Sequence, residues 1–405
     1  MRRSVSRWPR VRPCLIGFAL ASVAVTAPLA AQESVFNLSA FGLPASGESM
    51  RARGMGGVTT GLPDDLFSLE NPALVARAER AGFYLSLLGQ DSTVENSEVS
   101  HSSDDVVFPM GQAVFPAWYS TVFSIGYYQF VDFDAALEST VVFEGDTLPV
   151  ALDSEGGLFV LAPGLSYVVN ERTSIGASFD VYLGSRETIR SVQRFDLGGV
   201  FATTSDSLSR GFDGLGVTLG VEQQFGRGTR VGIGYRLRPT VSSEITETIE
   251  EVEIQRETDI NLPNAFSVGA STQLGEQLRV AGVFRRSGWE EFEINDVPQS
   301  DTADFLEYGG GVEYTPAERR LLIGPGAPIR FGMRWRQLPI TIDEQNVNEW
   351  TFSLGHSRRF GDRSRVDFLF EYGRRGSLDD IGLTERYVRL GFGIGAFEQW
   401  RRRRS

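Results

Sequence analysis

Beyond residue 80, apolar and polar residues alternate repeatedly, and this pattern constrains the fold more than any other feature of the chain. A period of two residues is the signature of β-strands with one apolar face. Residues 174–184 are an example, with these apolar positions on one face: Ile175, Ala177, Phe179, Val181 and Leu183. Comparable runs occur at residues 231–238, 329–336 and 388–395, so we predict an all-β fold.

Two all-β architectures alternate in this way, the soluble β-sandwich and the membrane β-barrel. In a sandwich the apolar face forms the core, whereas in a barrel it faces lipid and the polar face lines the lumen. Here the polar faces mix arginine with glycine, which suits a wall packed against a plug or water. Aromatic residues also lie near predicted strand ends, where interfacial girdles form: Trp118, Tyr119, Trp289, Trp335, Trp350 and Trp400. Both features favour a transmembrane antiparallel barrel.

The spacing of turns predicts how many strands the barrel has. Short polar turns are expected at residues 170–172, 226–228, 275–277 and 361–363, with a longer turn at 316–327 and a first turn at 116–120. Hairpins then cover residues 80–118, 121–170, 173–226, 229–275, 278–318, 328–361 and 364–400. They give about fourteen strands, with short turns in the periplasm and longer acidic loops outside the cell.

The N-terminus is typical of an exported protein. An arginine-rich start, an apolar stretch over residues 15–29 and small residues before position 32 indicate a signal peptide, residues 1–31, cleaved after Ala31. Cleavage would also remove Cys14, the only cysteine, so no disulfide is expected. Together with a barrel, this predicts the outer membrane of a Gram-negative-type bacterium, with residues 80–400 as the barrel and 401–405 as a basic periplasmic tail.

The charge balance excludes some partners. The net charge is −13, and every basic residue is arginine. An acidic exported chain repels phosphates, so no nucleic-acid partner is expected. The predicted surroundings are instead outer-membrane lipid and lipopolysaccharide, with the barrel-assembly machinery as a partner.

Residues 32–79 do not alternate, and we predict that they form a plug inside the lumen. A glycine-rich stretch, residues 54–58, would let the backbone approach the wall closely or adopt positive φ angles. Asp64 or Asp65 is expected to cap a short helix over residues 65–70, and Asn71-Pro72 to end it.

The order of three plug elements resembles a known group of proteins. These elements are Arg-x-x-Gly-Met-Gly-Gly at 51–57, Asp64-Asp65, and Asn-Pro-Ala at 71–73, with further similar runs at 212–236 and 262–289. The pattern resembles the FadL/TodX superfamily of outer-membrane hydrophobic-compound transport proteins. That resemblance implies a fourteen-stranded barrel with an N-terminal hatch, in agreement with the turn count. PorV-like proteins, which are associated with secretion, share the N-terminal pattern and are the related alternative.

The resemblance implies that the hatch gates passage of a hydrophobic small molecule, either a long-chain fatty acid or an aromatic hydrocarbon. The implied hatch and gating residues are Gly54, Met55, Gly56, Gly57, Asp64, Asp65, Asn71, Pro72 and Ala73. Pro163 and Pro263 interrupt strand runs and are expected to mark wall bulges or gaps. Inward glycines such as Gly391 either leave room beside the plug or relieve strand curvature.

No catalytic constellation is evident, so we expect no enzyme activity, no cofactor and no metal site. Only two histidines exist, His101 and His356, and neither has a nucleophile or a ligand cluster beside it. Calcium bound by loop carboxylates is an alternative. The competing functions are a scaffold that binds secretion-system proteins, as for PorV-like proteins, and a diffusion porin lined by arginines such as Arg236, Arg330, Arg334 and Arg336.

Overall fold

The computed structural model describes residues 34–38, 41–63, 67–96, 100–117, 120–143, 146–195, 201–249, 252–317, 327–361 and 363–398. The predicted signal peptide, Asp64, Asp65, Trp118, Tyr119, Trp400 and the arginine tail lie outside these ranges. Among the described residues, no helix has the length and apolar character needed to cross a membrane.

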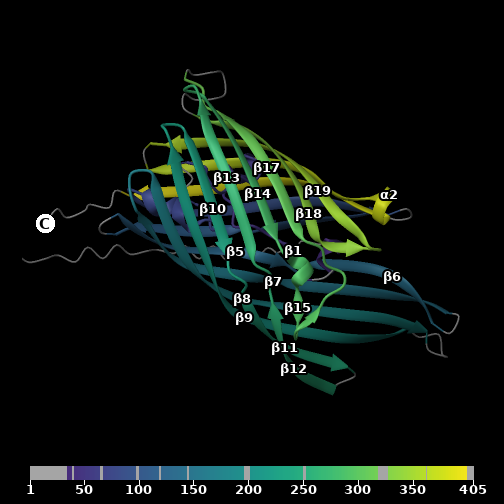
Figure 1. Cartoon of the computed structure of the whole chain (residues 1–405). Coiled ribbons are helices and arrows are strands. Elements are labelled where there is room, and N and C mark those ends of the chain that lie inside the picture. The colour runs from purple at the N-terminus through teal and green to yellow at the C-terminus, as the bar shows by residue number, and fades with distance from the viewer. Residues whose placement is uncertain are drawn as a thin grey trace, which may run out of the picture.

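Fourteen antiparallel strands close into a barrel, as predicted (Figure 1). The first and last strands complete the closure, with register from Ala81↔Glu398 to Asn96↔Leu383. Four of the wall strands are interrupted and therefore carry two labels each. The strands are β2 (Ala81–Asn96), β3 (Ser100–Val107), β4 (Met110–Pro116), β5 (Thr121–Asp132), β6 (Ala135–Phe143), β7 (Asp146–Val168), β8 (Thr173–Phe195), β9 (Phe201–Phe225), β10 (Thr229–Arg236), β11 (Thr240–Ile249), β12 (Val252–Asn261), β13 (Ala265–Leu274), β14 (Leu278–Ser287), β17 (Phe305–Tyr314), β18 (Ile329–Ile342), β19 (Gln345–Phe360), β20 (Ser364–Ser377) and β21 (Leu383–Glu398).

The direction of the side chains distinguishes the barrel from a sandwich. In β18 the apolar Phe331 is 62% exposed on the outside, whereas Arg330 and Arg334 are each 2% exposed on the inside. An apolar outer face and a charged inner face are expected when lipid surrounds the wall. The apolar residues of the alternating pattern therefore face outward and the charged residues face the lumen, as a membrane barrel requires.

One aromatic girdle is present on the outer face, but its membership differs from the prediction. Tyr308, Trp335 and Trp350 lie side by side across β17, β18 and β19, with ring centroids 5.7 and 6.4 Å apart. Trp289 was expected in such a girdle, and this is wrong because it is only 2% exposed. The segment after β14 folds inward as η3 (Trp289–Glu291), β15 (Glu293–Ile294) and β16 (Val297–Pro298), and this buries Trp289. The short helix α2 (Leu378–Ile381) lies between β20 and β21.

The described residues of the plug contact the inner faces of strands on several sides of the lumen. They include η1 (Val35–Leu38), β1 (Leu43–Pro44), α1 (Met50–Gly54) and η2 (Pro72–Arg77). Helix α1 contacts β18, β19, β20 and β21, while η2 contacts β5, β7, β8 and β9. The strand β1 pairs with the wall, with register Leu43↔Asp132.

The expected helix over residues 65–70 is wrong where the structure describes it. Residues 67–70 are not helical. Asn71 does not end a helix but begins one, because its side chain accepts a 3.0 Å hydrogen bond from the backbone N–H of Ala73. Pro72 then occupies the first helical position, where its missing N–H costs no hydrogen bond.

Candidate functional site

A seam of glycines joins the plug to the wall. Gly56 has a φ of +71°, and a Cβ placed on it would lie 2.5 Å from the carbonyl oxygen of Met333. Gly311 in the wall faces the plug in return, because a Cβ there would lie 2.7 Å from the Cα of Met55. Real Cβ atoms essentially never approach so closely, so glycine is required on both sides of the contact. The backbone of the predicted glycine stretch is therefore in direct contact with the backbone of the wall.

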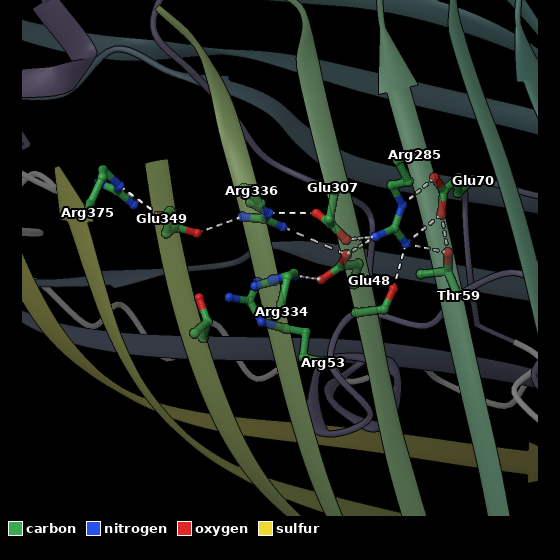
Figure 2. Close-up of polar contacts among 12 residues, drawn as sticks. Glu48, Arg53, Thr59, Glu70, Arg285, Glu307, Arg334, Arg336, Glu349 and Arg375 are labelled. Carbon is green, nitrogen blue, oxygen red and sulfur yellow. Dashed lines mark hydrogen bonds and ion pairs between the residues drawn. The ribbon is translucent and has the colours of Figure 1, made fainter. Parts of the chain in front are cut away.

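Next to this seam, a buried network of charges connects the plug to the wall (Figure 2). Glu48 of the plug has a side chain that is 0% exposed and lies among arginines of β14 and β18. Its carboxylate oxygens are 2.9 Å from Nη1 of Arg334 and 3.3 Å from Nη1 of Arg285. A third arginine, Arg336, lies 4.0 Å away. A carboxylate with three arginines around it is compensated by charge rather than by solvent.

The arrangement of charges explains why Glu48 stays ionised. Burial raises the pKa of Glu48, but the positive charges of Arg334, Arg285 and Arg336 outweigh burial. The pKa of Glu48 therefore lies below its ordinary value of 4.5.

Arg285 ties three parts of the plug together. Its Nη2 donates hydrogen bonds of 2.6 Å to the carbonyl oxygen of Gly57, 2.7 Å to Oγ1 of Thr59 and 2.7 Å to Oε2 of Glu70. Glu70 also accepts a hydrogen bond from Thr59. Gly57, Thr59 and Glu70 of the plug are thus held by one guanidinium from the wall.

In two other ion pairs the arginine belongs to the plug and the carboxylate to the wall, and both arginines are in α1. Arg51 forms a two-point contact with Glu313, with N–O distances of 2.9 and 3.0 Å. Arg53 does the same with Glu371, at 2.8 and 3.3 Å. Two parallel N–H···O bonds fix orientation as well as distance. The plug therefore contributes both carboxylates that pair with wall arginines and arginines that pair with wall carboxylates.

The wall also carries a ladder of its own that does not depend on the plug. Arg336 contacts Glu307 at 2.6 Å and Glu349 at 3.3 Å, and Arg375 joins Glu349 to Glu385 at 2.8 Å each. Figure 2 shows this chain of contacts running from strand to strand across the inner face. Arg336 and Arg375 of the inner face are thus paired with carboxylates of neighbouring strands.

The Asn-Pro-Ala element lies against a second pair of wall glycines. The side-chain amide of Asn71 donates to the carbonyl oxygen of Val221 at 3.2 Å, and Ser166 donates to that of Pro72 at 2.6 Å. A Cβ on Gly176 would lie 2.5 Å from the carbonyl carbon of Pro72. This element therefore fixes the end of the plug to β7, β8 and β9.

An aromatic chamber lies between the plug and the inward-folded segment that follows β14. Phe41 of the plug is at its centre, and its ring lies 5.4 Å from Phe133, 5.8 Å from Phe212 and 5.4 Å from Phe292. Trp289 lies 6.3 Å away. Clusters of rings at such distances are the usual packing of buried aromatic side chains.

A cavity of about 100 Å³ adjoins this chamber. Residues 44–47 of the plug form one side, and wall residues including Tyr128, Phe130, Trp289 and Phe305 form the others. The cavity also has a polar end, since the guanidinium of Arg236 lines it and lies 4.5 Å from the centre of the Phe130 ring. The cavity thus combines apolar side chains with three arginines, of which Arg285 pairs with Glu70 and Arg286 pairs with Asp304.

The two prolines singled out in the wall lie at different kinds of interruption. Pro163 is inside β7, and pairing with β8 is interrupted between Leu161↔Val181 and Gly164↔Ser178 without a change of register. Pro263 lies in the break between β12 and β13. Bulged register occurs instead in β5, between Gln129 and Val131.

The chemistry of the other singled-out residues adds no catalytic site. Among the described residues, no group of three or more histidine, cysteine or acidic side chains is arranged to hold a metal. His356 contacts the carbonyl oxygen of Pro328 through Nδ1 at 3.1 Å. Gly391 borders the plug, because a Cβ there would meet the side chain of Met50.

Sequence reasoning missed the charged residues of the plug. Glu48, Arg51, Arg53 and Glu70 are charged residues in a segment that is expected inside the lumen, and their charge was the available signal. A charge in a segment destined for the lumen requires a partner of opposite sign on the wall. The inward arginines and glutamates of β14, β17 and β18 are those partners.

Comparison with known families gives a match along nearly the whole chain. The family model named BamG matches residues 14–405. The chain belongs to the BamG family. A search of curated protein sequences gave no match for this BamG-family chain.

Three solved structures of similar shape have low sequence identity to this BamG-family chain. A FadL homologue from Pseudomonas aeruginosa has 13% identity, covers 89% of this chain and 100% of its own, and has a TM-score of 0.62. The toluene transporter TodX of P. putida has 15% identity, 90% and 100% coverage and a TM-score of 0.59. The toluene transporter TbuX of Ralstonia pickettii has 18% identity, 90% and 100% coverage and a TM-score of 0.57. The protein is thus an outer-membrane β-barrel with a FadL-like fold, as its sequence resemblance implied.

Proposed function

We propose that this protein binds a small hydrophobic compound in the aromatic chamber and admits it through the barrel. The observation that carries the proposal is the cavity that adjoins the aromatic chamber and is bordered by the plug and by several aromatic side chains, including Tyr128, Phe130 and Trp289. Apolar compounds gain free energy when they leave water for such a space. TodX and TbuX are described as toluene transporters, which makes a single-ring compound a suitable first ligand.

In this proposal the gate is the first part of the plug, residues 41–47, rather than the whole plug. This segment forms one side of the cavity, and it is attached to the wall by β1 and by the 2.9 Å hydrogen bond from Ala45 N to Phe130 O. Residues 48–70 are held instead by buried ion pairs. Backbone hydrogen bonds of a short segment are exchanged more cheaply than buried charges.

Arg236 adds a preference within this class of ligand. A buried guanidinium at one end of an apolar cavity favours compounds that carry a carboxylate or another polar group. A fatty acid and an aromatic hydrocarbon should therefore differ in their response to Arg236→Met. Only binding of the acid should weaken.

The test is uptake of labelled toluene and labelled fatty acid into proteoliposomes. Ala45→Phe should fill the cavity and reduce uptake of both compounds at least about tenfold, as loss of a well-formed apolar site requires. Ala177→Phe, on the exposed outer face of β8, is the matched control and should leave uptake unchanged. Equal uptake by empty liposomes, the wild type and Ala45→Phe would refute the proposal.

A second candidate is a structural role in the barrel-assembly machinery, and two observations favour it. The family carries the name BamG, and the plug is fastened to the wall by buried ion pairs on several strands. A barrel closed in this way can present its two ends to partner proteins without conducting anything. Purification of the tagged protein from native membranes tests this candidate. Enrichment of barrel-assembly proteins supports it, enrichment of secretion-system proteins supports the PorV-like alternative, and recovery of the barrel alone contradicts both.

A further inference from the structure

The periplasmic mouth of the barrel contains a second and much larger cavity, on the opposite side of the plug from the aromatic chamber. Its volume is about 700 Å³, within the ~300–1,000 Å³ range of ligand-binding pockets. Residues of the short turns and adjacent strand ends line it, among them Arg227, Glu276 and Pro328. Short turns face the periplasm in outer-membrane barrels, so this vestibule opens to that side.

The lining of the vestibule is strongly basic. Two glutamates, Glu276 and Glu313, accompany a larger set of arginines. The arginines are Arg51, Arg227, Arg230, Arg279, Arg330, Arg359 and Arg365. This excess of positive charge in the lining contrasts with the whole chain, whose net charge is −13.

The carboxylates around the vestibule are shared among these arginines. Glu313 alone contacts Arg51 at 2.9 Å, Arg279 at 3.1 Å and Arg330 at 2.7 Å. Arg230 pairs with Glu222, which is itself buried in the wall. One carboxylate among three guanidiniums leaves a positive potential in the space that they face.

At the rim, two arginines are free to meet a partner. Arg227 in the turn after β9 and Arg359 at the end of β19 are exposed, and neither forms an ion pair with another residue in the described ranges. They lie at different parts of the lining, so an extended partner can contact both.

We propose that this vestibule docks an acidic polypeptide segment of a periplasmic partner protein. Guanidinium groups bind carboxylates through paired hydrogen bonds, and several of them around one concave space favour a chain with repeated Asp or Glu side chains. The acidic outer loops of this protein, such as residues 244–259, are at the far end of the barrel and cannot supply that segment. The inference rests on the second candidate function and names the chemistry of its partner.

The experiment uses the full-length protein in detergent and a fluorescent deca-glutamate peptide as the probe. Fluorescence anisotropy should show saturable binding that weakens steeply as salt rises, because exposed charges are screened over about 10 Å at 0.1 M salt. Arg227→Glu/Arg359→Glu should weaken binding about tenfold or more, as expected when several exposed ion pairs are lost and replaced by repulsion. Arg238→Glu/Arg256→Glu makes the same change of net charge outside the vestibule, between β10 and β11 and within β12, and it should bind like the wild type.

Three outcomes would overturn the proposal. These are absence of peptide binding at low salt, equal weakening by the two double variants, and complete displacement of the peptide by millimolar inorganic phosphate, which would indicate a small-anion site. The same variants separate this inference from the function on which it rests. If partners from native membranes are retained by Arg227→Glu/Arg359→Glu, the vestibule is not the docking site although the assembly role stands. If the wild type retains none, the assembly role itself fails.

Discussion

At the scale of single residues, the structure rests on matching each plug charge with a wall charge. Glu48 is the clearest case, because its carboxylate is completely buried and lies between Arg285 and Arg334. Removing one member of a buried pair costs about 3–5 kcal/mol, since the remaining charge stays buried without compensation. A single side chain can therefore control whether the plug stays in place.

We predict that Glu48→Gln loosens the plug at neutral pH. The amide keeps the shape of the carboxylate but removes the charge that Arg285 and Arg334 require. The variant should leak ions in planar bilayers at pH 7, whereas the wild type should be silent. Glu95→Gln, which removes the exposed pair with Arg386, is the control and should also be silent.

The pH dependence of the wild type follows from the same carboxylate. The pKa of Glu48 is lower in the folded state than its ordinary value of 4.5, so its contribution to stability is fully present above 4.5. That contribution declines as the pH falls through the lowered pKa. Conductance of the wild type should thus stay low from pH 7 to 5 and appear only at pH values below 4.5. A silent Glu48→Gln variant, or a wild type that leaks at pH 6, would contradict this view of Glu48.

The sequence predicted one half of this residue-level pattern. Gly54, Gly56 and Gly57 were recognisable because backbone contact requires glycine, whatever the partner is. Glu48 was not, since its role depends on arginines more than two hundred residues away in the chain. Period-two alternation places Arg334 on the inner face but does not specify which plug residue it meets.

At the scale of elements, the strands were predictable and the plug helices were not. Strand faces follow directly from alternation, and the positions of the short turns set the hairpins. The plug contains α1 and η2, each only a few residues long, and their ends depend on contacts with the wall. Asn71 was expected to end a helix but caps the next one, because a proline that follows an asparagine suits a helix start as well as a helix end.

We predict that Asn71→Ala loosens η2 without unfolding the barrel. The variant loses the cap on Ala73 and the contact with Val221, which together should cost about 1–2 kcal/mol locally. Hydrogen exchange of the backbone amides of residues 73–77 should accelerate, while exchange in β8 and β9 stays slow. Ser377→Ala is a matched control, because Ser377 precedes α2 without a side-chain capping bond. Unchanged exchange in Asn71→Ala would show that the wall glycines alone position η2.

At the scale of the whole molecule, most ion pairs on the inner face of the wall do not require the plug. When the plug is taken away, Arg336 keeps Glu307 and Glu349, and Arg375 keeps Glu349 and Glu385. Glu313 likewise keeps Arg279 and Arg330. Arg334 alone loses its nearest carboxylate, although Glu371 lies 3.9 Å away. The wall ladder therefore compensates most of its own buried charge.

This independence predicts that the barrel folds without its plug. Deletion of residues 34–79 should give a protein that still migrates as a compact barrel in unheated gels, because β2 and β21 close the wall through their own register. Its lumen should then conduct ions steadily at pH 7, whereas the wild type should not. Adding Arg334→Met to the deletion should raise its resistance to denaturant, since a buried arginine that has lost its nearest carboxylate is removed. If the deletion variant aggregates and Arg334→Met does not rescue it, the wall needs the plug in order to fold. The hatch would then be too important to the fold to move during uptake.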